Sequence, residues 1–164
     1  MAEKILEEKM EGARGALKRG EWDKFVSLHE KHYRPSAVDY LESRGAPSNE
    51  IWKVLRRVWL MLENFEDTQM WWEQRFERAN EEDAQLFMGS ENWAKFLDLK
   101  FPLKIYRGGV AKGLSWTVDE AQAEWFAERL GEGEVREMEV SKAEVFAFLE
   151  DRKESEIILR KARW

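Results

Sequence analysis

The sequence predicts an α+β protein in which a helical N-terminal half packs on a small split β core. Helical spacing of apolar side chains continues to about residue 100. A proline at position 102 then interrupts that pattern, and short apolar runs separated by glycines follow. We therefore expect a helical region over residues 1–100 and a β core over residues 101–164, together forming one compact unit.

Composition is typical of a soluble globular protein. Of the 164 residues, 43% are hydrophobic and 37% charged, which is too apolar for a disordered chain. The net charge of −6 is spread along the sequence, so a nucleic-acid partner is not expected. No apolar run reaches membrane-spanning length, and the N-terminus lacks the apolar segment of a signal peptide. Cysteine is absent, and we expect a cytoplasmic protein with no membrane partner.

Capping and breaking residues divide the helical region. Ser36 is a candidate N-cap, and the strongest apolar pattern follows Pro47 and reaches Phe65. Asn80 is a second candidate N-cap, and Gly89 should interrupt the helix that it begins. Most of the nine tryptophans lie at helical spacing, which places them in the core. The expected helices are residues 2–19, 21–32, 36–45, 48–65, 68–79, 80–87 and 90–99.

Strand patterns and one further helix follow residue 101. The expected strands are residues 103–106, 114–116, 135–140, 145–149 and 157–159. Alternation within residues 135–140 slips once, which allows a β-bulge. Residues 117–120 have the form of a capping box, so they predict a helix as far as residue 130 with Thr117 as its N-cap.

Two carboxylates stand at the beginning of the last strand. Glu154 and Glu156 are two positions apart, immediately before the apolar residues 157–159. In an extended segment alternate side chains share a face, so both glutamates should point the same way. Like charges at such a position are unfavourable unless they bind something. The alternative is an edge strand whose acidic residues prevent pairing with another chain.

Three short motifs lie in order at the ends of strands: Tyr106-Arg107-Gly108, Ser115-Trp116-Thr117 and Glu154-Ser155-Glu156. Together they resemble the ADP-ribosyltransferase fold, in the branch defined by Arg, Ser-Thr-Ser and Glu-x-Glu motifs. The segment Trp125-Phe126-Ala127-x-Arg129 is also similar to this branch, including its small bacterial and bacteriophage members. The resemblance covers about residues 103–160 and implies a small split β core of ADP-ribosyltransferase type.

The resemblance implies NAD as co-substrate and assigns catalytic roles. Glu156 matches the carboxylate that stabilises the oxocarbenium-like ribose and holds its 2′-hydroxyl. Arg107 matches the guanidinium that binds the phosphate-bearing part of NAD, for which a planar fork is well suited. Ser115 matches the serine that orients this glutamate or the ribose. Glu154 matches the glutamate that assists transfer to an acceptor, and its alternative is a solvated turn residue.

Further residues of the three motifs carry expectations and alternatives. Tyr106, Gly108 and Trp116 are implied to be NAD-binding residues. Trp116 replaces a smaller residue of the family pattern, so it either packs under the site or limits the nicotinamide pocket. Each residue also has an ordinary structural alternative, and for Thr117 we favour the N-cap. No metal site is expected, because the histidine pair at positions 29 and 32 lacks a third ligand.

The function expected from this resemblance is mono-ADP-ribosyl transfer from NAD to a macromolecular acceptor. A protein acceptor is favoured, and a phage-type effector acting on host machinery is one form of this activity. The first alternative is a catalytically silent protein of the same fold that binds and inhibits a partner. The second is an NAD glycohydrolase that transfers ADP-ribose to water.

Overall fold

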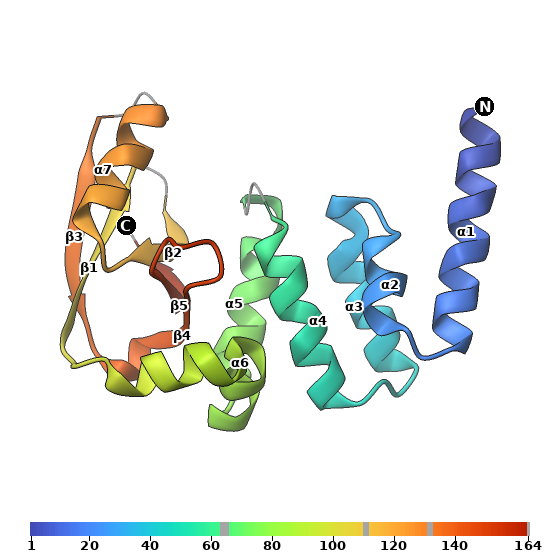
Figure 1. Ribbon diagram of the computed structural model, residues 1–164, viewed down its shortest axis with the longest axis horizontal. Helices are drawn as coiled ribbons and strands as arrows, with labels where there is room; N and C mark the ends of the chain where they lie inside the picture. Colours follow the sequence, from blue (N-terminus) through green and yellow to red (C-terminus); the bar gives the residue numbers. More distant parts are fainter. Residues whose placement is uncertain (63–65, 110–111, 131–132, 164) are drawn as a thin grey trace. The chain divides into compact units, whose positions relative to one another are not determined.

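The computed structural model describes residues 1–62, 66–109, 112–130 and 133–163 (Figure 1). It confirms the α+β class, since helices precede one antiparallel sheet. The chain divides into two compact units, Met1–Asn64 and Phe65–Trp164. Secondary structure changes near residue 101, as the sequence predicts, but this change lies inside the second unit. Within the described ranges, no helix combines the length and apolar character needed to cross a membrane.

The first unit is entirely helical in its described part. Its elements are α1 (Ala2–Lys18), α2 (Trp22–Ser27), the 3-10 helix η1 (Lys31–Tyr33), α3 (Arg34–Ser43) and α4 (Ser48–Leu60). The apolar pattern after Pro47 forms α4, which buries Leu55, Val58 and Trp59 and contacts α2 and α3. This helix ends at Leu60, and Phe65 lies outside the described residues.

Two helix boundaries in this unit differ from the prediction. The single helix expected over residues 21–32 is wrong, because the extended backbone of Glu30 (ψ 147°) separates α2 from η1. Ser36 is not an N-cap, because α3 already begins at Arg34. Pro35 is compatible with that start, since the first turn of a helix leaves backbone N–H groups without intrahelical acceptors.

In the second unit, η2 (Glu66–Thr68), α5 (Gln69–Arg78) and α6 (Glu81–Asp98) precede the sheet. Asn80 caps α6 as predicted. Its side-chain oxygen accepts a hydrogen bond from Asp83 N at 2.8 Å, and the Asp83 carboxylate accepts one from Asn80 N. Gly89 interrupts the helix, as its sequence indicates, with a non-helical φ of 75° that glycine adopts readily.

The sheet contains β1 (Leu103–Gly108), β2 (Gly113–Thr117), β3 (Val135–Val140), β4 (Val145–Leu149) and β5 (Glu156–Arg163), in the order β3-β1-β2-β5-β4. All neighbouring pairs are antiparallel. Since β5 lies between β2 and β4, the interpretation of its acidic residues as edge protection is wrong. The β1–β3 register is continuous, so the bulge allowed in residues 135–140 does not form. Irregular register occurs instead where β5 pairs with β2 and β4.

Helix α7 (Glu120–Arg129) lies along β1 (Figure 1). Its N-cap is Asp119 and not Thr117, because the Asp119 carboxylate accepts hydrogen bonds from Ala121 N at 3.0 Å and Gln122 N at 3.4 Å. Thr117 ends β2, where its hydroxyl accepts a hydrogen bond from Asp119 N at 3.0 Å. The capping-box pattern therefore begins two residues before the actual N-cap of the helix.

Aromatic packing attaches α5 and α6 to the sheet. Phe146 of β4 stacks on Phe76 of α5 with ring centroids 4.2 Å apart, and it contacts Phe87 of α6 at 5.1 Å. From β5, Arg160 donates hydrogen bonds to the carbonyls of Phe76 (2.5 Å) and Ala79 (2.9 Å) at the C-terminal end of α5. A cation at this position also complements the helix dipole.

We predict that Gly108→Ala destabilises the second unit. A Cβ at Gly108 would lie 2.6 Å from Ala127 N and closer still to Ala123 O, so α7 would have to move away from β1. Overpacking of this kind costs about 1–3 kcal/mol in free energy of unfolding, measurable by denaturant titration.

Gly133→Ala is the matched control in the same unit. Gly133 has a φ of +57°, and no atom lies within 4 Å of the position that a Cβ would take, so only backbone strain of about 1 kcal/mol is expected there. A Gly108 variant that is as stable as the unsubstituted protein would contradict the close approach of α7 to β1.

Candidate functional site

Strand register places three motif residues in one row across the sheet. Tyr106 of β1 lies opposite Thr117 of β2, and Thr117 lies opposite Glu156 of β5. Directly opposed residues project from the same face, so these three side chains start on one side of the sheet. Ser115 shares that face because it is two residues before Thr117 in β2. The three motifs thus meet on neighbouring strands, although the first and the last of them are more than 40 residues apart in the sequence.

Glu156 is the buried carboxylate of this row. Only 3% of the residue is exposed, at the first position of β5. The Ser115 hydroxyl donates a hydrogen bond of 2.5 Å to Glu156 Oε2. A hydrogen bond to an ionised carboxylate is charge-assisted, and this one fixes the orientation of the Glu156 carboxylate. Ser115 and Glu156, which come from separate motifs, are thus in direct contact.

Glu154 lies near Glu156, but on a turn and not on the extended segment that was predicted. An extended segment is wrong for this motif, because Ser155 has a φ of 47° and Lys153 a φ of 57°. Such left-handed conformations are uncommon outside glycine and cost about 1–2 kcal/mol per residue. The turn is held by side chains, since Thr117 Oγ1 donates to Glu154 O at 2.7 Å and Ser155 Oγ donates to Glu150 Oε1 at 2.7 Å.

Arg152 joins the two glutamates. Its Nη2 donates to both carboxylate oxygens of Glu156, at 3.1 and 3.2 Å, and its Nε lies 3.4 Å from Glu154 Oε2. No role for this residue was predicted from the sequence. Its spacing was the available signal, because Arg152 precedes the two glutamates by two and four positions. One guanidinium therefore balances two like charges that would otherwise repel each other.

The environment of Glu154 shifts the pKa of its carboxyl group upward. Burial, the largest cause, raises the pKa of the Glu154 carboxyl above its usual range. The Arg152 guanidinium opposes this shift, and the neighbouring Glu156 carboxylate adds to it. A carboxyl group with a raised pKa beside a second carboxylate is suited to proton transfer.

Arg107 lies where β1 and β2 separate. In the described part of the chain, these strands pair only through Tyr106 and Thr117. The Arg107 guanidinium packs against Gly113, where any Cβ would collide with it, and Nη1 donates a 2.5 Å hydrogen bond to Ser115 O. The structure thus brings Arg107 to the strand that carries Ser115, with the guanidinium bound to the main chain of that strand.

Trp116 and Gly108, two of the predicted NAD-binding residues, are packed against other parts of the second unit. Trp116 is 3% exposed, and its Nε1 donates to Gly113 O at 3.1 Å, so the indole belongs to the core. Gly108 lies under the backbone of α7, as the collision of a Cβ with Ala123 and Ala127 shows. Tyr106, in contrast, is only partly buried and lies in the same row as Glu156.

A buried asparagine on α6 supports the turn that carries the glutamates. Asn92 is 4% exposed; its Nδ2 donates to Asp151 Oδ2 at 2.8 Å and to Met88 O at 2.9 Å, and its Oδ1 accepts from Glu150 N at 3.0 Å. This residue was not predicted from the sequence. The available signal was a polar side chain on an apolar helical stripe, four residues from both Met88 and Phe96.

The helix motif of the resemblance lies on the surface of α7. Trp125 is 48% exposed, and the Arg129 guanidinium lies 5.0 Å from the centre of its indole ring. This distance is within the range of cation–π attraction. The motif thus contributes buried Ala127, which packs on β1, together with an exposed aromatic and cationic pair.

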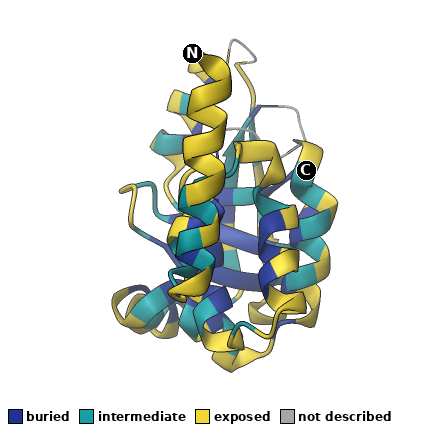
Figure 2. Cartoon of the chain, turned by 90° about the vertical axis from the view of Figure 1, so that its right-hand side faces the viewer, coloured by how far each residue is buried: buried dark blue, intermediate teal, exposed yellow. Residues whose placement is uncertain are grey.

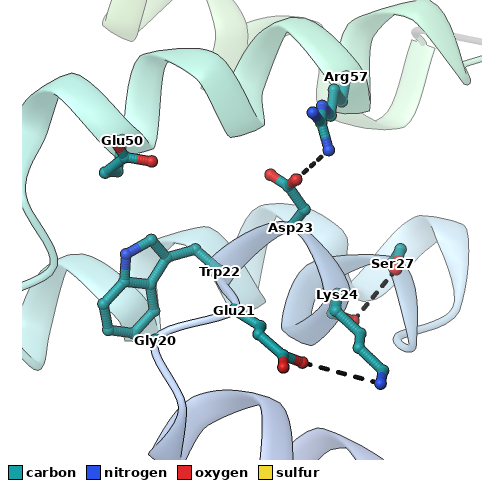
Figure 3. Close-up of a pocket in the computed structure, with 8 residues that line it drawn as sticks. All are labelled: Gly20, Glu21, Trp22, Asp23, Lys24, Ser27, Glu50 and Arg57. Atoms are coloured by element: carbon teal, nitrogen blue, oxygen red, sulfur yellow. Dashed lines mark hydrogen bonds and ion pairs between the residues drawn. The ribbon is translucent and has the colours of Figure 1, made fainter.

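A separate hollow of about 500 Å³ lies between α2 and α4 in the first unit (Figure 3). The Trp22 indole forms part of its lining, and Asp23 projects toward Arg57 across the opening, with which it forms an ion pair. Glu50 at the opposite end pairs with Lys53 at 3.2 Å. None of the three sequence motifs contributes to this hollow.

Comparison of the chain with protein-family models, with curated proteins and with solved structures gives no significant match. The chemistry of the site therefore rests on the residues themselves. They provide a buried, oriented carboxylate, a second carboxyl group with a raised pKa, and the Arg152 guanidinium in contact with both, while the Arg107 guanidinium binds the main chain of the neighbouring strand at Ser115.

Glu154→Gln is predicted to stabilise the protein at neutral pH. Because its pKa is raised on folding, the stability that Glu154 contributes is fully present below the unfolded pKa of about 4.3 and is lost as the pH rises through the higher folded pKa. The glutamine side chain of the Glu154→Gln variant does not ionise, so the variant does not lose this stability. Its free energy of unfolding should therefore exceed that of the unsubstituted protein at pH 7, and the difference should shrink as the pH is lowered toward 4.

Denaturant titrations of both proteins over this pH range provide the measurement. Glu124→Gln removes an exposed glutamate on α7 and controls for the change in net charge. A Glu154→Gln variant less stable than the unsubstituted protein at pH 7 would show that the pair with Arg152 outweighs the burial of the carboxylate.

Proposed function

We propose that the protein transfers a single ADP-ribose unit from NAD to a macromolecular acceptor, for which we favour a protein. The observation that supports this most directly is the hydrogen bond between Ser115 and the buried Glu156 carboxylate. It joins two motifs 41 residues apart in the sequence, in the relation that the resemblance to ADP-ribosyltransferases implies. A split β core of that type and action in the cytoplasm are parts of the same proposal.

In the proposed reaction, the bond between ribose C1′ and the nicotinamide nitrogen breaks. The bonding electron pair leaves with nicotinamide, and positive charge develops on the ribose as in glycoside hydrolysis. A fixed carboxylate stabilises this charge better than water does, because it is already oriented before the reaction begins. Glu156 has that role, and Ser115 holds its carboxylate in place.

The acceptor nucleophile then forms a bond to C1′ and loses its proton. We assign the removal of this proton to Glu154, which lies beside Glu156 on the other side of the Arg152 guanidinium. Arg107 binds the diphosphate of NAD, and Tyr106 contacts the same ligand from the adjacent strand. Since Arg107 also donates to Ser115 O, its binding of phosphate and the position of Ser115 are coupled.

Arg152 enters this proposal as a positioning residue. In the structure it contacts both carboxylates and therefore balances their charge. A positively charged ribose placed against Glu156 would compete with it for the same oxygens. Arg152 is partly exposed (32% of its side chain), so its guanidinium can turn toward water when the competing charge develops.

A catalytically silent protein that binds and inhibits a partner is the second candidate. The observation that favours it is also the Arg152 contact, because Glu156 is 3% exposed and both of its oxygens already accept hydrogen bonds. In that case the motif is an ion-pair network that stabilises the turn. The two candidates differ in whether the protein consumes NAD.

Glu156→Gln is predicted to reduce NAD turnover by about 100-fold or more, because one preorganised electrostatic group is removed. The amide retains the size of the side chain, so the fold should be kept. Nicotinamide release, followed by chromatography, measures the effect, and Glu124→Gln is the control for a change in charge alone. NAD turnover by the Glu156 variant at the unsubstituted rate would exclude Glu156 as the catalytic carboxylate, whereas an inactive unsubstituted protein would favour the silent candidate.

Glu154→Gln is predicted to separate transfer from hydrolysis. Water can replace the acceptor without help from Glu154, so hydrolysis of NAD to ADP-ribose should continue while acceptor labelling falls by about 100-fold. Labelling can be measured by intact mass of the proteins captured from a lysate, where each transfer adds one ADP-ribose. Equal loss of both activities in this variant would contradict the division of roles between Glu154 and Glu156.

A further inference from the structure

Helix α1 exposes an apolar stripe. Leu6 and Met10, one turn apart on one face, are 59% and 47% exposed, and the helix has a single buried residue, Ala16. Viewed toward α1, most of its N-terminal half is exposed (Figure 2). Large apolar side chains grouped on one face of a surface helix, in contrast to scattered ones, indicate an interaction surface.

Helix α2 covers a neighbouring strip of α1 and leaves Leu6 and Met10 exposed. Gly12 of α1 lies against Leu28, where a Cβ would come within 3.3 Å of Cδ1, and Lys9 pairs with Glu30 at 4.0 Å. Together with Ala16, these residues form the strip that α1 directs toward α2. The open stripe is a second strip beside it.

Leu6 and Met10 belong to a series with the spacing of a coiled-coil seam. Leu6, Met10, Ala13 and Leu17, the first two exposed and the last two half-buried, follow one another by four, three and four positions, which is the spacing of core residues in a heptad repeat. Residues of this kind pack against a second helix with the same pattern. In heptad positions, Glu7 and Arg14 occupy the flank of the seam that faces away from α2.

We propose that the occupant of this seam is α1 of a second copy of the chain, in antiparallel orientation. Antiparallel packing places Glu7 of each copy beside Arg14 of the other, which gives two identical ion pairs related by a twofold axis. Within the part of the chain that the structure describes, neither side chain forms an ion pair. Parallel packing would instead bring Lys9 of one copy close to Arg14 of the other, where like charges repel.

The charge of α1 also argues against a membrane surface as the occupant. Its four glutamates are balanced by four lysines and arginines, whereas helices that lie on anionic membranes have a cationic polar face. At 1.5 Å per residue, the 17 residues of α1 span about 25 Å. An interface of that length is at the small end of specific interfaces, so the association should be weak and dependent on concentration.

The test measures the mass of the full chain by sedimentation across a concentration series. We expect a shift from the monomer mass of 19.5 kDa toward twice that value. Glu7→Arg and Arg14→Glu each convert both ion pairs into repulsive contacts, so each variant alone should associate about tenfold or more weakly. Circular dichroism of each variant checks that its helices are intact.

Sedimentation of an equimolar mixture of the two variants is the decisive measurement. One chain then has arginine at both positions and the other has glutamate at both, so both contacts become attractive and a mixed dimer should form. The double variant with both changes should recover association with itself. A helix that uses its stripe for another purpose would not show this reciprocal recovery.

A full chain that stays monomeric at all concentrations would overturn the proposal, as would single variants that associate like the unsubstituted protein. Binding of the monomer to vesicles of phosphatidylcholine and phosphatidylglycerol, without dimer formation, would assign the stripe to a membrane and also overturn it. NAD turnover is not involved in any of these measurements, so the proposal stands or falls independently of the catalytic one.

Discussion

The second unit is organised around one buried charge, the Glu156 carboxylate at the first position of β5. An isolated carboxylate in such a place is strongly unfavourable, so the surrounding structure has to provide partners for it. Ser115 supplies a hydroxyl from β2, and Arg152 supplies a guanidinium from the preceding turn. Loss of one partner should therefore be more disruptive than loss of the whole network, because a buried charge without a partner destabilises a fold most.

The turn before β5 carries Arg152, and its backbone conformation is unfavourable by itself. Two residues other than glycine, Lys153 and Ser155, have positive φ angles there. Such backbone persists only where the surroundings hold it, and here the hydroxyl of Thr117 and the amide of Asn92 do so. A strained and well-supported turn beside two carboxylates is consistent with a functional site.

Much of this architecture follows from local patterns in the sequence. The Asn80 cap, the break at Gly89 and the α+β class were predictable because each depends on neighbouring residues. The relation of Ser115 to Glu156 was predictable only through the resemblance between motifs, since it depends on strand order. The roles of Arg152 and Asn92 were not predicted, because they depend on a turn whose left-handed residues carry no glycine signal. The Thr117 cap was assigned wrongly because Thr117 and Asp119 offer similar capping groups two residues apart.

The single described pair between β1 and β2 has a consequence for any ligand that binds Arg107. In the described part of the chain, the register pair of Tyr106 and Thr117 joins two ladders, β3–β1 and β2–β5–β4, and a side-chain hydrogen bond from Arg107 to Ser115 O also links them. An anion that draws this guanidinium away removes this hydrogen bond and leaves a main-chain carbonyl in need of a donor. Binding would then be thermodynamically linked to the separation of the two ladders. The affinity for the anion would fall if the junction between β1 and β2 were made more rigid, and this junction would loosen when the anion binds.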